Sequence, residues 1–110
     1  MVISDDGSDS HVIADDLLIN PGQYVVLARN GDAGSNGGVT ADYVYGNDIE
    51  LANTSDELIL SCQGTEIDRV EYDDGATFPD PTGASMQLGE LTDDNNAGAS
   101  WCEATEAFGD

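Results

Sequence analysis

The residues in this sequence best suited to chemistry are Asp and Asn side chains gathered in three polar stretches. Hard cations such as Ca²⁺ prefer clustered carboxylate and amide oxygens on flexible loops, so these stretches are candidate calcium sites. None follows the EF-hand spacing, because Asp32 in its first position would put Gly34 third and Tyr43 twelfth. Asp- and Asn-rich turns on a solvated face are the alternative. The candidate ligands are Asp5, Asp6, Asp9, Asp32, Asn36, Asp93 and Asp94.

Catalytic arrangements find little support in the residue types. A Ser-His-Asp arrangement needs a histidine, and His11 is the only one, placed beside Val12 and Ile13 in a short apolar run. A pair of carboxylates of the kind used by glycosidases cannot be recognised in this sequence. With 23 acidic residues, many pairs would have a suitable separation by chance. We therefore expect no enzymatic activity and no cofactor other than calcium.

Two cysteines, Cys62 and Cys102, stand 40 residues apart. A zinc site would need four ligands at close spacings, and no such set is present. A structural disulfide and two unrelated buried thiols are the remaining alternatives. We predict the disulfide, because an even cysteine pair in a small acidic domain fits an exported protein better than a cytosolic one.

The charge balance excludes several classes of partner. Asp and Glu number 23 against two Arg and no Lys, giving a formal charge of −21 over 110 residues. Nucleic acids and anionic membrane surfaces need Lys and Arg to neutralise phosphates, so neither is an expected partner. The sequence contains no run of about 18 apolar residues, so membrane insertion is not expected. Residues 1–6 do not follow the pattern of a signal peptide. Dissolved salt would screen the repulsion among the excess negative charges. We therefore expect a salt-adapted, marine source.

Short strands, and no helix, are the elements that must position these residues. Turn-forming Gly, Asn, Asp and Ser interrupt the chain every eight to twelve residues. Leu, Ile, Val and Phe make up about a fifth of the chain, so its core must be thin. The pattern predicts a single all-β domain over residues 1–110, an antiparallel sandwich or barrel. Strands are predicted at 10–14, 16–19, 23–28, 42–45, 49–52, 57–62, 65–72 and 84–88.

The segments 57–62 and 65–72 flank Gln63-Gly64 and are typical of a hairpin. Apolar and polar residues alternate in the second segment, except that Ile67 and Val70 are three positions apart instead of two. This interruption predicts a β-bulge.

The order and spacing of these segments resemble the lamin-tail domain family over about residues 3 to 102. The matching residues are the PGQYVVLA run at 21–28, Leu51-Ala52-Asn53, Asp56 to Leu60, Gly64, Ile67-Asp68 with Val70 and Tyr72, the GASMQL run at 83–88, and Trp101-Cys102.

The resemblance implies an immunoglobulin-like antiparallel β-sandwich. Members of the family begin earlier, so the chain is expected to be a fragment that lacks its N-terminal strands. A sandwich without those strands exposes backbone and core, and we expect a homodimer or higher oligomer through them.

The expected function is that of a non-catalytic binding or attachment module, extracellular or at the cell surface of a bacterium, within a larger secreted protein. Its partner is expected to be a protein or a glycan. A calcium- or carbohydrate-binding accessory module is the alternative, because Asp and Asn loops and exposed aromatic rings serve such ligands.

Overall fold

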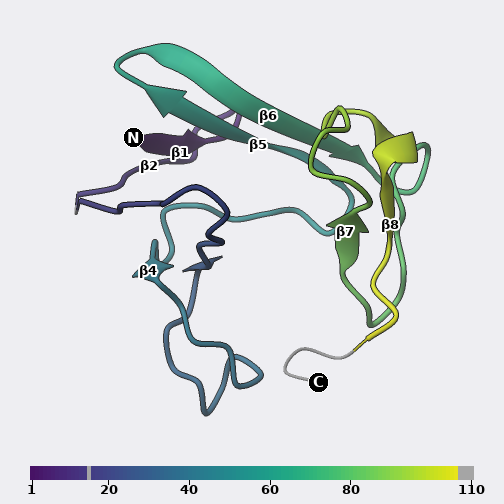
Figure 1. The fold of residues 1–110 in the computed structure, drawn as a ribbon, viewed down its shortest axis with the longest axis horizontal. Helices are drawn as coiled ribbons and strands as arrows, with labels where there is room; N and C mark the ends of the chain where they lie inside the picture. The colour runs from purple at the N-terminus through teal and green to yellow at the C-terminus, as the bar shows by residue number, and fades with distance from the viewer. Residues whose placement is uncertain (15, 107–110) are drawn as a thin grey trace.

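The computed structural model describes residues 1–14 and 16–106, and within them the regular structure is almost entirely β (Figure 1). No helix in this described part is long and apolar enough to cross a membrane. The elements are β1 (Val2–Ser4), β2 (Ser10–Val12), β3 (Leu27–Ala28), β4 (Tyr43–Val44), β5 (Ser55–Cys62), β6 (Thr65–Asp73), β7 (Met86–Leu88), the 3₁₀ turn η1 (Gly98–Ser100) and β8 (Trp101–Glu103).

The hairpin of β5 and β6 is the longest paired structure and confirms the sequence prediction. The two strands are antiparallel and are joined at Gln63 and Gly64. The predicted bulge is also present. Leu60 lies opposite Asp68 and Ser61 lies opposite Glu66, so Ile67 is the extra residue on β6.

A four-stranded antiparallel sheet grows from this hairpin in the order β2-β1-β5-β6. Ile3 on β1 lies opposite Leu60 on β5 and opposite His11 on β2. The side chain of Ile3 points from the sheet into the core, where it packs with Ile13 and Ile49 and is 2% exposed.

A smaller second layer faces this sheet. It contains the parallel pair of β3 and β4, in which Leu27 lies opposite Tyr43. Ile3, Ile13 and Ile49 form the buried centre between the layers. Leu17, Leu27, Tyr43, Tyr45, Leu58 and Leu60 pack around them, partly buried. The all-β class is therefore confirmed, whereas the immunoglobulin-like sandwich stays a prediction.

Several predicted strands differ from those observed. The run 23–28 pairs only at Leu27–Ala28, and residues 16–19 and 49–52 form no strand. Conversely, Trp101–Glu103 forms β8 beyond the last predicted strand. The side-chain pattern shows that a segment can form a strand. Whether it does so depends on a second strand to pair with, which the local sequence does not specify.

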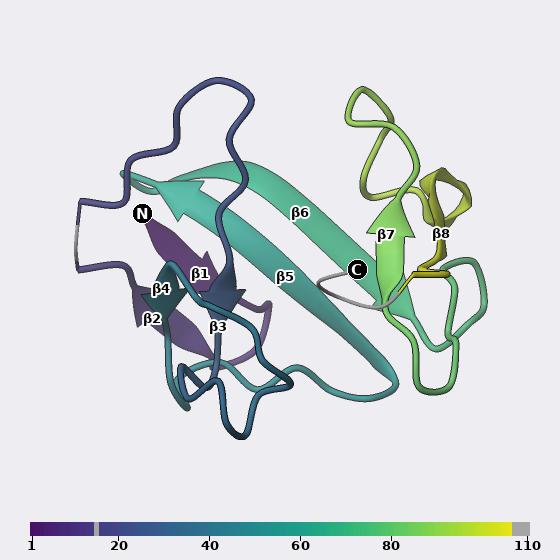
Figure 2. The same ribbon diagram turned by 60° about the horizontal axis from the view of Figure 1, so that its bottom comes forward.

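The antiparallel pair of β7 and β8 lies at the far end of the hairpin from the Gln63–Gly64 turn (Figures 1 and 2). Two asparagines before β8 attach it to β6: Asn95 Nδ2 donates to the Asp68 carboxylate at 2.8 and 2.9 Å, and Asn96 Oδ1 accepts from the Glu71 amide at 2.7 Å. Gly98 packs so closely on the backbone of Thr77 that an added Cβ would lie 2.4 Å from it. The strand pair is thus held by polar contacts and close backbone packing.

The molecule leaves an unusually large surface exposed. Its accessible area is 7555 Å², whereas a compact monomer of this mass exposes about 5800 Å². The radius of gyration is 14.3 Å, compared with about 13 Å for a compact chain of this length. Among the described residues only five hydrophobic side chains are buried: Ile3, Ile13, Ile49, Ile59 and Phe78. The two layers therefore close only part of a core.

The predicted disulfide between Cys62 and Cys102 is wrong, and so is the alternative of two buried thiols. Both cysteines are free and exposed. Cys62 ends β5 beside the hairpin turn, whereas Cys102 lies on β8 at the other end of the hairpin (Figure 1). A disulfide requires Cα atoms about 4.4–6.8 Å apart, which this arrangement does not offer.

Both thiols are expected to react. Titration with a thiol reagent under native, non-reducing conditions should count two thiols per chain. Replacing both by Ser should change the free energy of unfolding by less than about 0.5 kcal/mol, the range for surface substitutions. A mass two hydrogens below that of the reduced chain, or a loss of about 3 kcal/mol or more in the double variant, would contradict this assignment.

Candidate functional site

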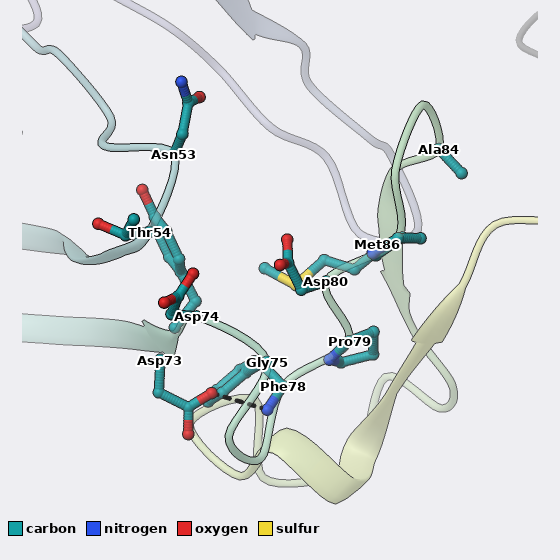
Figure 3. Close-up of a pocket in the computed structure, with 12 residues that line it drawn as sticks. Asn53, Thr54, Asp73, Asp74, Gly75, Phe78, Pro79, Asp80, Ala84 and Met86 are labelled. Atoms are coloured by element: carbon teal, nitrogen blue, oxygen red, sulfur yellow. Dashed lines mark hydrogen bonds between the residues drawn. The ribbon is translucent and has the colours of Figure 1, made fainter.

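The best-defined pocket lies between the open end of the β5–β6 hairpin and β7, with a volume of about 170 Å³ (Figure 3). We call it the acid-rimmed pocket. Asp74 and Thr54 lie on one side, and Asp80 and Met86 lie on the other. Its lining contains no basic residue. The lining residues are Asn53, Thr54, Tyr72, Asp73, Asp74, Gly75, Phe78, Pro79, Asp80, Pro81, Ala84 and Met86.

The loop that carries most of this pocket is shaped by Asp73, the last residue of β6. Its carboxylate accepts hydrogen bonds from Thr77 Oγ1 at 2.5 Å, from the Thr77 amide at 3.0 Å and from the Phe78 amide at 2.9 Å. These donors, the Thr77 hydroxyl first, lower the pKa of Asp73 below its ordinary value because they stabilise the ionised form. Asp73 therefore organises the loop, and its neighbours Asp74 and Asp80 form the rim.

Gly75 allows the two rim carboxylates to approach the pocket. Asp74 and Gly75 both have positive φ, at 57° and 78°, and the Ala76 amide donates to the Asp73 carbonyl at 3.2 Å. An added Cβ on Gly75 would lie 3.3 Å from Asp80 Cβ. A side chain at this position would thus strain the turn and crowd Asp80.

The floor of the pocket is apolar. Phe78 is 4% exposed and packs against Trp101, with ring centroids 6.2 Å apart. Trp101 is held in turn by its Nε1, which donates to the Asn95 carbonyl at 2.8 Å. Tyr72 closes one wall, and its hydroxyl donates to the Ala52 carbonyl at 2.5 Å. Burial and the nearby Asp56 and Glu57 raise the pKa of Tyr72 to about 12, so the phenol stays protonated.

The positive charges of the described structure are used elsewhere. Arg69 on β6 makes five hydrogen bonds to three carboxylates, those of Asp6, Glu66 and Glu71. A guanidinium has five N–H donors, so Arg69 has none left for an outside anion. These bonds, with Arg69 as the largest cause, lower the pKa of Asp6 and Glu66. Arg29 donates to Asn47 at 3.2 Å and lies 3.9 Å from Glu50.

His11 is also engaged within the structure. Its Nδ1 lies 2.8 Å from Asp48 Oδ2, and its Nε2 lies 2.7 Å from the Tyr43 hydroxyl. The same hydroxyl accepts a hydrogen bond from the Ala14 amide at 3.4 Å. Because β2 carries His11 and β4 carries Tyr43, this chain of contacts joins the edge of the four-stranded sheet to the second layer. His11 therefore has a structural role, because both of its ring nitrogens bind side chains of the same chain.

The three predicted calcium stretches lie apart from the acid-rimmed pocket and bond within the chain. Around the β1–β2 turn, Asp5 Oδ1 accepts from the Asp9 amide at 2.9 Å, Asp9 Oδ2 accepts from the Glu50 amide at 2.8 Å, and Asp6 binds Arg69. The structure thus directs these three carboxylates to different donors.

The other two stretches form turns. Asp32 Oδ1 accepts from the Gly34 amide at 3.1 Å, and Asn36 binds Val39 through both its amide atoms. Asp94 Oδ1 accepts from the Asn96 amide at 3.0 Å, next to Asp93. Within residues 1–14 and 16–106, no group of three or more His, Cys, Asp or Glu side chains has the arrangement of a metal site. Asn side-chain oxygens can also bind calcium, and calcium binding by these stretches stays a prediction.

Sequence reasoning did not find the acid-rimmed pocket. Asp73, Asp74 and Asp80 are indistinguishable by type from the other acidic residues, and Phe78 falls between the predicted strands 65–72 and 84–88. The usable signal was Asp74-Gly75, a dipeptide typical of a tight turn, directly after a strand.

Comparison of the chain with protein families, curated proteins and solved structures gives no match.

Replacing Arg69 by Gln should lower the urea midpoint of unfolding. The substitution leaves the carboxylates of Asp6, Glu66 and Glu71 close together without a cation. Arg29→Gln is the matched control, because it removes the same charge from a side chain with a single hydrogen bond. The difference between the two variants should narrow from 0.1 M to 1 M salt, as the Debye length falls from about 10 to 3 Å. Equal midpoints for the two variants would refute this role of Arg69.

Thr77→Val should raise the pKa of Asp73 toward the ordinary value of about 3.9, because the variant lacks the hydroxyl donor. A carboxylate with a lowered folded-state pKa stabilises the fold above its unfolded pKa, and that stabilisation is lost as the pH falls through the folded value. The variant should therefore lose stability at a higher pH than the parent. Carboxyl-carbon NMR titration of Asp73 measures the change, with Thr82→Val as the control. Identical titrations in both variants would contradict the assignment.

Proposed function

We propose that the chain is a non-catalytic binding module of lamin-tail type, within an exported or cell-surface protein, that holds a cationic side chain of a partner protein in the acid-rimmed pocket. One observation carries the proposal: the apolar side chains of Phe78 and Met86 and the carboxylates of Asp74 and Asp80 line the same pocket, with no basic residue in the lining. Lys and Arg combine an apolar stem with a charged head, so this pocket complements both parts.

The size of the pocket favours a single side chain over a cofactor. Pockets for small molecules usually measure about 300–1,000 Å³, whereas this one measures about 170 Å³. An extended Lys or Arg stem can lie along the floor while its head reaches the rim. The neutral phenol of Tyr72 adds a wall that does not repel a cation.

The charge of the whole chain supports the same partner. A formal charge of −21 attracts a basic surface over distances longer than the pocket and raises the rate of encounter. Since Arg69 is neutralised by three carboxylates, it does not offset the field near β6. Binding should therefore weaken steeply as salt increases.

NMR titration with acetyl-Gly-Arg-Gly-amide tests the proposal. The amides of Asp74, Gly75 and Asp80 and the methyl of Met86 should shift. The double variant Asp74→Asn, Asp80→Asn should bind about three- to tenfold more weakly, as expected for two exposed charge pairs. Asn tolerates the positive φ of residue 74, so the turn is kept. The double variant Asp32→Asn, Asp93→Asn is the matched control, because it removes two charges outside the pocket.

Three outcomes would overturn the proposal. One is equal affinity of the parent and the double variant for the peptide. A second is equal affinity for acetyl-Gly-Leu-Gly-amide, which lacks the cation. A third is a response of the same resonances to submillimolar CaCl₂ without a response to the arginine peptide, which would make the pocket a calcium site.

A further inference from the structure

Three apolar cavities lie next to one another along the four-stranded sheet, with volumes of about 480, 260 and 170 Å³, and Leu27 of the second layer lines the second and third. The first and second share Met1, Ile13 and Leu17, and the second and third share Leu27 and Leu60. We call this series the apolar channel. The shared residues place the three cavities next to one another, along Ile3 of β1 and along Leu58, Leu60 and Cys62 of β5.

Exposed apolar side chains surround the outer part of this channel. Leu18, Ile19 and Tyr24 line it and are 81%, 54% and 75% exposed. Contiguous apolar surface of this kind marks interaction sites in soluble proteins. The excess of accessible area over a compact monomer is therefore partly explained by surface that the described chain does not cover.

The backbone beside the channel also lacks partners. Within the described residues, no hydrogen bond reaches the N–H or C=O of Tyr24 or Val25, although Val26 binds Asp42 and Tyr43. The run 23–26 has the β-branched and aromatic composition of a strand. In the described part of the chain, Tyr24 and Val25 are thus suited to a strand but have no backbone partner. An added strand would supply the missing backbone partners.

The negative charge of the chain favours a basic segment over a second copy of the chain as the ligand of the apolar channel. Among the described residues, Asp16 is the only charged side chain that lines the channel, and the chain as a whole carries −21. A second copy would bring another −21 to the same interface, and its repulsion would oppose burial of the apolar side chains. A segment that carries Lys or Arg on its outward face would instead be attracted.

We propose that the apolar channel binds an extended segment of a partner protein in which apolar residues alternate with Lys or Arg, paired through its backbone with Tyr24 and Val25. In a strand, alternate side chains point to opposite faces, so one face enters the channel while the basic face meets the acidic surface. The channel and the acid-rimmed pocket share no lining residue, and this proposal does not depend on the pocket.

The probe is the peptide acetyl-(Val-Lys)₄-amide, titrated into the ¹⁵N-labelled chain. Amide shifts are expected at residues 13–27 and 58–62, with slower solvent exchange of the Tyr24 and Val25 amides. The control peptide acetyl-Val₄-Lys₄-amide has the same composition and charge without alternation. It should bind at least about tenfold more weakly, which is about 1.4 kcal/mol.

Leu17→Gln places a polar group in the channel and should weaken binding about tenfold. Leu18→Gln changes a side chain that is 81% exposed and therefore tests the same surface without disturbing the core. It should weaken binding about threefold. Leu91→Gln, at an exposed leucine outside the channel lining, should leave binding unchanged.

The proposal is wrong if both peptides bind alike, if no shift occurs at millimolar peptide, or if the shifts are confined to residues 53–54 and 72–86, which carry the acid-rimmed pocket. Concentration-dependent shifts at residues 13–27 without peptide would also overturn it, because they would assign the channel to a second copy of the chain.

Discussion

The hydrogen-bonded ladder between β5 and β6 is the interaction to which the other parts of the structure are attached. β1 pairs with β5 on one side, and Asn95 and Asn96 reach β6 on the other. Its strands are neighbours in sequence joined by a short turn, so little loop entropy opposes their pairing. Strands of two or three residues, which are too short to form alone, can therefore keep their places.

The scarcity of basic residues determines how the carboxylates are used. With two arginines for 23 acidic residues, most carboxylates have no cation to bind. Asp5, Asp32, Asp73 and Asp94 instead accept hydrogen bonds from backbone amides in turns. The amide dipoles supply the positive partner that Lys would provide elsewhere. Acidity in this chain is consequently also a means of shaping loops, and the carboxylates of Asp74 and Asp80 are left to face solvent at a pocket.

Features set by local sequence were predictable, and features set by pairing were not. Alternation and Gln63-Gly64 predicted the hairpin, and the interruption after Ile67 predicted the bulge, because each depends on adjacent residues. Residues 23–26 have the composition of a strand but lie beside a channel without a strand partner. The position of Cys102 depends on contacts of Asn95 and Asn96 with β6, which no spacing between cysteines reveals. The acid-rimmed pocket likewise arises where two sheets meet.

The separation of the two free cysteines has a consequence for cooperativity. No covalent bond joins the β7–β8 pair to the rest of the described chain except through the backbone, and its side-chain hydrogen bonds to the hairpin reach Asp68 and Glu71 of β6. The β1–β2 side and the second layer meet the hairpin elsewhere. The β1–β2 side is thus attached to β5 and the β7–β8 pair to β6, so the two share the hairpin but no single strand. We expect them to open as separate units, because cooperative units of one fold differ in local stability.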